Sequence, residues 1–425
     1  MSNRKNLVVM VGVLGLLGAS TAFAAKKDKD KDVAAEAAAN DPCGVRKISK
    51  KVDKPMSEAE KAFNGKQWDE VLAKVTEAEA VPVEKSLWDQ YWIHEFRGRA
   101  YLSQEKYAEA AKELEPGLSS PCMDTADKPA RARMLLQIAY RLKEYPKVIE
   151  VGNKYLETNK DPDIATYVGN AYYATDDFAN TRRVMTDVVA QQEAGSTPPE
   201  ELTYRILQGA CLKLKDMACV TDQLEKLVIH YPKPNYWQDL LSLLMAGTPT
   251  HKPTNNQLLN MWRLADNANV IEDPAEFLEM AQLAMSQGLP GEAQAVLEKG
   301  MQKNVFTRAS QKDQANQLLS EAKQAVTLDK STLDKQDASA RAKPTGDNDV
   351  KLGAAYLSYG ENAKAIEALQ RGIAKGGVKN PDDAGLLLGM AQLRSGNKAE
   401  AAKAFNTVTK DSTMTRIAKL WLLNT

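Results

Sequence analysis

A ladder of small and large side chains recurs along this chain of 425 residues and constrains its fold more than any other feature. In the copy that starts at Gly98, Ala110 follows at +12, Leu114 at +16 and Gly117 at +19. Further copies start at Ala59, Gly169, Gln208, Ala281, Gly353 and Gly389. Positions +12, +16 and +19 share one face of a helix, and the start shares a face with +3 on an earlier helix. The ladder therefore predicts pairs of antiparallel helices.

The residues between the two helices of a pair are turn-like. Gly288, Gly360 and Gly396 each lie at +7, where a helix must stop. Small residues at the start and at +12 allow two helix backbones to approach closely, and we expect the large residue at +16 to fill the wedge between successive pairs. Each copy is thus one helical hairpin.

The spacing of the copies predicts a continuous array. Starts lie about 36 to 39 residues apart, or about twice that where a weaker copy is hidden. Hidden copies are expected near Leu135–Tyr140, at 235–269 with a loop at 246–255, and at 310–342, where the chain is highly charged. A terminal helix at 415–423 would cover the last apolar face. The predicted fold class is all-α, a solenoid of about ten helical hairpins.

Composition agrees with this fold and excludes some functions. Only 6% of the residues are aromatic, which argues against a β-sandwich or barrel. The 56 basic and 56 acidic residues balance, so there is no overall charge to attract nucleic acid or a membrane surface. Nucleic acid is therefore not an expected partner, and the chain is not expected to be embedded in a membrane.

The segment 168–178 carries a family resemblance, with the sequence Val-Gly-Asn-Ala-Tyr-Tyr-Ala-Thr-Asp-Asp-Phe. Together with Leu352–Tyr356 and Leu388–Ala391, it resembles a tetratricopeptide repeat (TPR), and the resemblance covers most of 57–411. It implies a right-handed superhelix. The chain departs from the family at Gln208, at 235–269 and at 308–345, where stacking is expected to be irregular.

Stacked hairpins provide a concave groove lined by first helices, which suits an extended or helical peptide. Candidate groove residues lie on the first helix of a hairpin, at positions that do not belong to the ladder. The alternative for each is a solvated or packing role. They are Trp92, Glu95, Arg99, Thr166, Asn170, Tyr173, Arg205 and Lys213. The sequence therefore favours a protein-binding scaffold.

The segment Tyr231–Leu241 is similar to a group of exported proteobacterial repeat proteins found beside TonB, ExbB and ExbD. This likeness implies partners in the cell envelope of the energy-transduction and transport type. The alternative is a glycan-associated module in polysaccharide export or cell-wall turnover, which would use exposed aromatics such as Tyr91, Trp92 and Tyr173.

The first 24 residues have the three parts of a secretory signal. Arg4 and Lys5 precede an apolar run at 7–17, and small residues then predict cleavage between Ala24 and Ala25. The apolar run is shorter than the roughly 20 residues of a membrane span. We expect a periplasmic protein with a disordered linker at 25–56, a first array at 57–270, an irregular charged region within 271–345, and a last pair with a capping helix at 346–425.

All four cysteines lie after the signal and are even in number, which predicts two disulfides. Cys211 and Cys219 flank one predicted turn and are expected to pair, which leaves Cys43 to pair with Cys122. The alternatives are another connectivity or free buried thiols. Their spacing does not suit a zinc site.

Motifs for catalysis are absent from the sequence. His94, His230 and His251 form no metal-ligand spacing, and there is no nucleophile elbow or phosphate-binding glycine loop. We expect neither an enzyme nor a cofactor or metal site.

Overall fold

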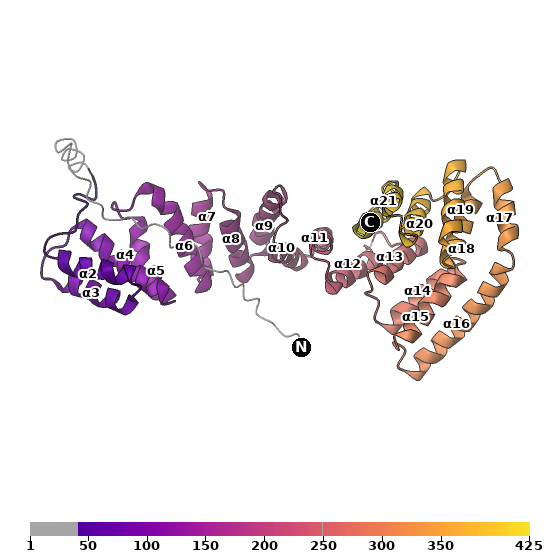
Figure 1. The fold of residues 1–425 in the computed structure, drawn as a ribbon, viewed down its shortest axis with the longest axis horizontal. Helices are drawn as coiled ribbons and strands as arrows, with labels where there is room; N and C mark the ends of the chain where they lie inside the picture. Colours follow the sequence, from indigo (N-terminus) through magenta and orange to yellow (C-terminus); the bar gives the residue numbers. More distant parts are fainter. Residues whose placement is uncertain (1–40, 249) are drawn as a thin grey trace. The chain divides into compact units, whose positions relative to one another are not determined.

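The computed structural model describes residues 41–248 and 250–425 and divides the chain into two compact units, residues 1–144 and 145–425. The predicted signal with its cleavage site at Ala24 and Ala25, and the linker up to residue 40, lie outside the described residues. Over the described ranges the regular structure is entirely helical, apart from one isolated bridge between Thr248 and His251. The predicted all-α solenoid of hairpins is confirmed (Figure 1).

Unit 1 consists of α2 (Asp53–Asn64), α3 (Trp68–Ala80), α4 (Leu87–Ser103), α5 (Tyr107–Leu114), η1 (Glu115–Leu118), η2 (Thr125–Asp127) and α6 (Lys128–Arg141). Unit 2 begins with α7 (Tyr145–Leu156), α8 (Pro162–Ala174), α9 (Phe178–Glu193), α10 (Glu201–Lys213), α11 (Met217–His230), α12 (Pro234–Ala246) and α13 (Asn255–Asn267). It continues with α14 (Pro274–Ser286), α15 (Pro290–Gln302), α16 (Ala309–Lys330), α17 (Leu333–Ala342), α18 (Asp347–Ser358), α19 (Asn362–Lys375), α20 (Pro381–Arg394), α21 (Lys398–Phe405), α22 (Ser412–Trp421) and η3 (Leu422–Asn424).

The ladder describes how the two helices of one hairpin pack. A Cβ atom added to Gly98 would lie 2.4 Å from Cγ of Leu114, and one added to Gly353 would lie 2.5 Å from Cγ of Leu369. The large residue at +16 therefore occupies the space above the starting glycine of its own hairpin. In unit 1 this residue also faces the next helix, as expected for one that fills the wedge between successive pairs, because Leu114 shares a buried cluster with Leu135 and Ile138 of α6.

The residue at +7 ends the first helix in a left-handed conformation. Gly288 and Gly360 have φ of 72° and 73° there, as the turn requires. In other copies a side chain takes the same backbone conformation, with φ of 59° at Glu105 and 61° at Asp176. The turn geometry is thus common to copies with and without glycine.

The hidden copies are also helical. Those at 235–269 and 310–342 correspond to α12–α13 and to α16–α17, although α16 is 22 residues long and α17 only 10. Near Leu135–Tyr140, the expected helices are α6 and α7.

α18 packs directly on α15, and Gly291 lies so close to Tyr359 that an added Cβ would meet its ring at 2.5 Å.

The terminal helix α22 contacts α13 and α20 in addition to its neighbour α21. Gln257 on α13 donates to Asp411 over 2.9 Å, and Asn260 donates to Asp383 over 3.0 Å. Arg416 on α22 also donates to Asp222 on α11 over 3.2 Å. The end of unit 2 therefore returns to its middle, an arrangement that the ladder does not predict.

The structure pairs Cys43 with Cys122 and Cys211 with Cys219, the pairs that the sequence favours. The first disulfide joins the segment before α2 to the loop after η1, within unit 1. The second joins α10 to α11 across their turn. In the described part of the chain, none of the helices combines the length and apolar character of a membrane span.

Candidate functional site

Unit 2 contains a groove of about 760 Å³, which we call the C-terminal groove. It is bordered by α13, α17, α18 and α20, and by the turn between α14 and α15. These helices belong to different hairpins. The return of the chain end towards α13 places them around one space.

The floor of the groove is apolar and its rim is polar. Leu259, Leu352 and Leu387 come from α13, α18 and α20, and each is almost fully buried. Lys335 and Lys351 lie on the rim with exposed side chains. A surface of this kind suits a segment of protein that places apolar side chains on the floor and polar groups at the rim.

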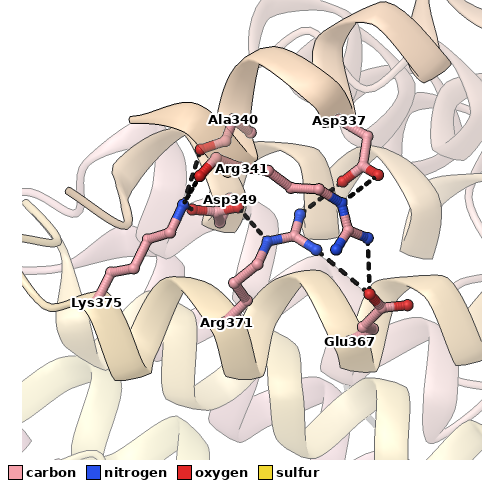
Figure 2. Close-up of polar contacts among 7 residues, drawn as sticks. All are labelled: Asp337, Ala340, Arg341, Asp349, Glu367, Arg371 and Lys375. Carbon is pink, nitrogen blue, oxygen red and sulfur yellow. Dashed lines mark hydrogen bonds and ion pairs between the residues drawn. The ribbon is translucent and has the colours of Figure 1, made fainter. Parts of the chain in front are cut away.

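An ion cluster fixes α17 as one wall of the groove. Asp349 on α18 has no exposed side-chain surface and accepts from Nε of Arg371 at 2.6 Å and from Nζ of Lys375 at 2.8 Å. Arg371 also reaches Asp337 on α17 at 2.6 Å, and Lys375 donates to the carbonyl oxygen of Ala340 at 2.8 Å (Figure 2). Two cations of α19 therefore hold α17 and α18 together.

The charges of this cluster shift the pKa values of its members. Burial would raise the pKa of Asp337, but hydrogen bonds from Arg341 and Arg371 outweigh it and lower that pKa. Arg341 also pairs with Glu367 on α19 at 2.7 Å (Figure 2). α17 is thus secured by a network rather than by one exposed pair, which would contribute little.

The opposite wall is a chain of polar contacts along α13. Nη1 of Arg263 donates to Oδ1 of Asn260 over 2.9 Å, and Asn260 in turn donates to Asp383 of α20. The Arg263 guanidinium also binds Glu292 of α15 through two hydrogen bonds of 2.7 and 2.6 Å. Asn260 and Arg263 are buried, so these contacts replace water that the side chains lose on folding.

Three of the groove residues expected from the sequence lie on α4 of unit 1. Glu95 is 2% exposed and pairs with Arg131 of α6 at 2.6 Å, so it holds two helices of the unit together. Arg99 remains partly exposed and donates to Glu95 over 3.0 Å. Trp92 packs partly against Phe96, with ring centroids 5.4 Å apart.

The other five lie on α8 and α10 of unit 2 and do not line the C-terminal groove. Thr166, Asn170 and Tyr173 are half-buried on α8, and Arg205 and Lys213 are exposed on α10. Tyr173 packs against Gly209 of α10, where an added Cβ would lie 2.9 Å from its hydroxyl oxygen.

The sequence did not single out the C-terminal groove. Its walls include α17, in a stretch whose charged pattern suggested irregular stacking. The signal that could have found it lies in the copies starting at Gly353 and Gly389, whose first helices are α18 and α20. Lys351 and Asp383 are non-ladder residues of those helices.

Metal-binding clusters of three or more His, Cys, Asp or Glu side chains do not occur within residues 41–248 and 250–425. His94 of α4 contacts Glu113 of α5 at 2.7 Å. The C-terminal groove has a concave shape, apolar surface and charged side chains, which suit the binding of a protein segment.

Comparison with known proteins identifies part of the chain. Residues 350–414, which include α18 to α21, match the family profile described as "Tetratricopeptide repeat". This confirms the resemblance for that segment, which is well short of half of the chain. No match was found among the curated proteins.

Several solved structures are similar. One is a tetratricopeptide repeat protein from Parabacteroides merdae, with 11% identity, a TM-score of 0.30, and coverage of 78% of this chain and 99% of that one. Another is Naa15/Naa10 bound to HypK-THB, with 13% identity, a TM-score of 0.30, and coverage of 85% and 64%. A third is the TPR2AB-domain:pHSP90 complex of yeast Sti1, with 16% identity, a TM-score of 0.24, and coverage of 70% and 99%. At these identities and TM-scores, nothing about the partners of this chain follows from theirs.

Proposed function

We propose that the chain is a non-enzymatic scaffold that binds a segment of a partner protein in the C-terminal groove. The observation that carries this proposal is the groove itself, a hollow of about 760 Å³ with an apolar floor and a charged rim. Its lining comes from α13, α17, α18 and α20 of different hairpins, so a bound segment would contact several repeats at once. Peptide recognition by helical repeats uses surfaces of this kind.

We further propose that the scaffold acts in the periplasm. The signal-like residues 1–24 support this location, and so do the two disulfides, because such bonds persist in oxidising compartments. The likeness of Tyr231–Leu241 to exported repeat proteins found beside TonB, ExbB and ExbD makes an energy-transduction or transport assembly the proposed partner. That segment covers the turn after α11 and the first part of α12.

The test is crosslinked capture from envelope extracts with the full chain as bait. The rim variant K335E/K351E reverses two exposed charges of the groove, and K398E/K410E reverses two exposed charges outside it as a matched control. We expect a specific envelope protein with the unaltered chain and with the control, and its loss with the rim variant. Equal recovery by all three, or recovery of bulk proteins alone, would reject the groove as the binding surface.

A glycan-associated role is a second candidate, and one feature of unit 1 favours it. Trp88 and Tyr91 are half-exposed on α4 and stacked with ring centroids 5.9 Å apart, and Trp92 lies beside both. Partial burial raises the pKa of Tyr91 to about 12, so its hydroxyl stays protonated. Sedimentation with isolated cell walls tests this role, and loss of binding in W88A with retention in K335E/K351E would favour it over the groove.

A further inference from the structure

A second, smaller hollow of about 140 Å³ lies beside the C-terminal groove. Arg263 and Ala354 line both hollows, so the two share a wall. The smaller one continues between α15, α18 and the end of α20, where Arg394 stands. The two hollows are therefore adjacent.

The charged residues around this small hollow do not balance. Glu292 is held by two hydrogen bonds from Arg263, and Asp266 by Lys299 at 2.6 Å. Arg394 is the third cation, and its one recorded hydrogen bond among the described residues is a long 3.4 Å contact to the carbonyl oxygen of Leu357. Both carboxylates that line the hollow are thus engaged by other cations, which leaves one positive charge in excess.

Arg394 is available to a ligand. Its side chain is exposed, although the walls of the hollow surround it and remove part of its hydration. This desolvation lowers the pKa of Arg394, while the charge of Glu292 opposes the shift. An incoming anion would restore the lost interactions, and a planar guanidinium binds a carboxylate through two parallel hydrogen bonds.

We propose that Arg394 binds the carboxylate of an Asp or Glu side chain of the segment in the C-terminal groove. The inference rests on the proposed function, since it requires a bound segment. The hollow has room for a carboxylate and a few waters, because one water takes roughly 30 Å³. The expected partner segment therefore combines apolar residues for the groove floor with one acidic residue for the small hollow.

The experiment selects peptides on the full chain from a phage-displayed library of random peptides. We expect the selected peptides to share an acidic position. A synthetic selected peptide and its Glu-to-Gln or Asp-to-Asn counterpart are then titrated by fluorescence anisotropy against the unaltered chain, R394Q and the matched control R308Q, which alters an exposed arginine outside both hollows. R394Q should weaken the acidic peptide about tenfold and leave the amide peptide unchanged, because a charge-assisted hydrogen bond contributes about 1.5 kcal/mol or more.

The outcomes separate the two proposals. The role of Arg394 would be overturned if the selected peptides share no acidic position, or if R394Q binds them with unchanged affinity. If K335E/K351E still fails to bind those peptides, the groove itself remains the binding surface. Failure to select any peptide would overturn both. A phosphoserine counterpart that binds more tightly than the acidic peptide would overturn the assignment to a carboxylate. Unchanged affinity of R394Q for the amide peptide shows that the variant is folded.

Discussion

Unit 1 and the stretch of unit 2 from α12 to η3 are built from the same hairpin but are held together in different ways. In unit 1 helices contact neighbours that are one or two places away in sequence, and a disulfide between Cys43 and Cys122 spans 79 residues, with the ion pair of Arg46 and Asp124 beside it. Both disulfides of the chain lie before α12. From α12 onward polar side chains make the distant contacts, and Asn260 meets Asp383 across 123 residues.

The difference shows that the hairpin ladder specifies pairs but not how a row of pairs curves. In unit 1 a covalent bond fixes the segment before α2. In unit 2 the contacts of α13 with α20 and α22 close the row on itself and create the C-terminal groove. Variants that remove one of these contacts at a time show whether the hairpin packing, the disulfide and the polar closure stabilise the chain independently.

The largest expected effect is the loss of the disulfide in unit 1. The variant C43S/C122S removes a link across 79 residues, which should lower the free energy of unfolding of unit 1 by about 4.5 kcal/mol through chain entropy. The variant C211S/C219S opens a loop of 8 residues and should cost about 2.5 kcal/mol. Denaturant unfolding, followed by hydrogen exchange of each unit, checks both values. If the shorter link proves the more important, the entropic account of the first tie is wrong.

The next effect concerns the hairpin itself and should be equal in the two regions. G98A in unit 1 and G353A in unit 2 each place a Cβ within about 2.5 Å of the leucine at +16. Overpacking of this kind should cost about 2 kcal/mol in either unit. Thermal unfolding measures this cost. The double variants G98A/L114A and G353A/L369A test the cause, since a smaller residue at +16 should relieve part of the clash. Markedly unequal costs in the two units would mean that the ladder is not one packing rule.

The sequence predicts the hairpins well because their determinants are local. Gly98 and Leu114 lie sixteen residues apart in the same pair, so their spacing reveals the pair, although the close contact between them became visible only in the structure. The turn at +7 is local too, and it forms at Glu105 as it does at Gly360. For the same reason the hidden copies are found from weak patterns, including the charged stretch that forms α16 and α17.

The C-terminal groove could not be predicted, because it depends on contacts between residues that have no fixed spacing. Asn260 and Gln257 resemble solvated helix residues until α20 and α22 cover them. Glu95 misled in the same sense, since this charged residue outside the ladder was expected in the groove and is buried by its pairing with Arg131. For polar residues outside the ladder, the sequence alone therefore does not distinguish a solvated position from one buried between helices.

A smaller effect is expected where unit 2 closes on itself. N260A removes the hydrogen bonds to Asp383 and to Nη1 of Arg263, and the loss of these partly buried contacts should cost about 1.5 kcal/mol. Hydrogen exchange should rise in α20 and α22 while the hairpin α8–α9 keeps its protection. N153A, which loses one hydrogen bond to Tyr172 in α7–α8, is the matched control. Uniform loss of protection throughout unit 2 would contradict a separable closure.

The smallest effect is a pH dependence of stability that has opposite signs in the two regions. Glu225 on α11, which pairs with Arg416 on α22, has its pKa raised above the ordinary 4.5 because burial outweighs the ion pair. Its contribution to stability is therefore complete below about pH 4.5 and is lost as the pH rises through its folded pKa. In unit 1, burial raises the pKa of Asp89, but hydrogen bonds from Ser49 and Ser86 outweigh it and lower that pKa below the ordinary 3.8. Its contribution is present above 3.8 and is lost as the pH falls through its folded pKa.

Acidification should thus loosen the segment held by Asp89 while the contact of Glu225 with α22 persists. Carboxyl chemical shifts followed by NMR between pH 2 and pH 7 give the two titrations directly, and hydrogen exchange reports on each contact. D89N and E225Q are the matched neutral variants, and each should flatten the pH dependence of its own region only. If both contacts weaken together in acid, the buried carboxyl of Glu225 is ionised in the folded chain, and the closure of unit 2 depends on its charge as the first tie depends on that of Asp89.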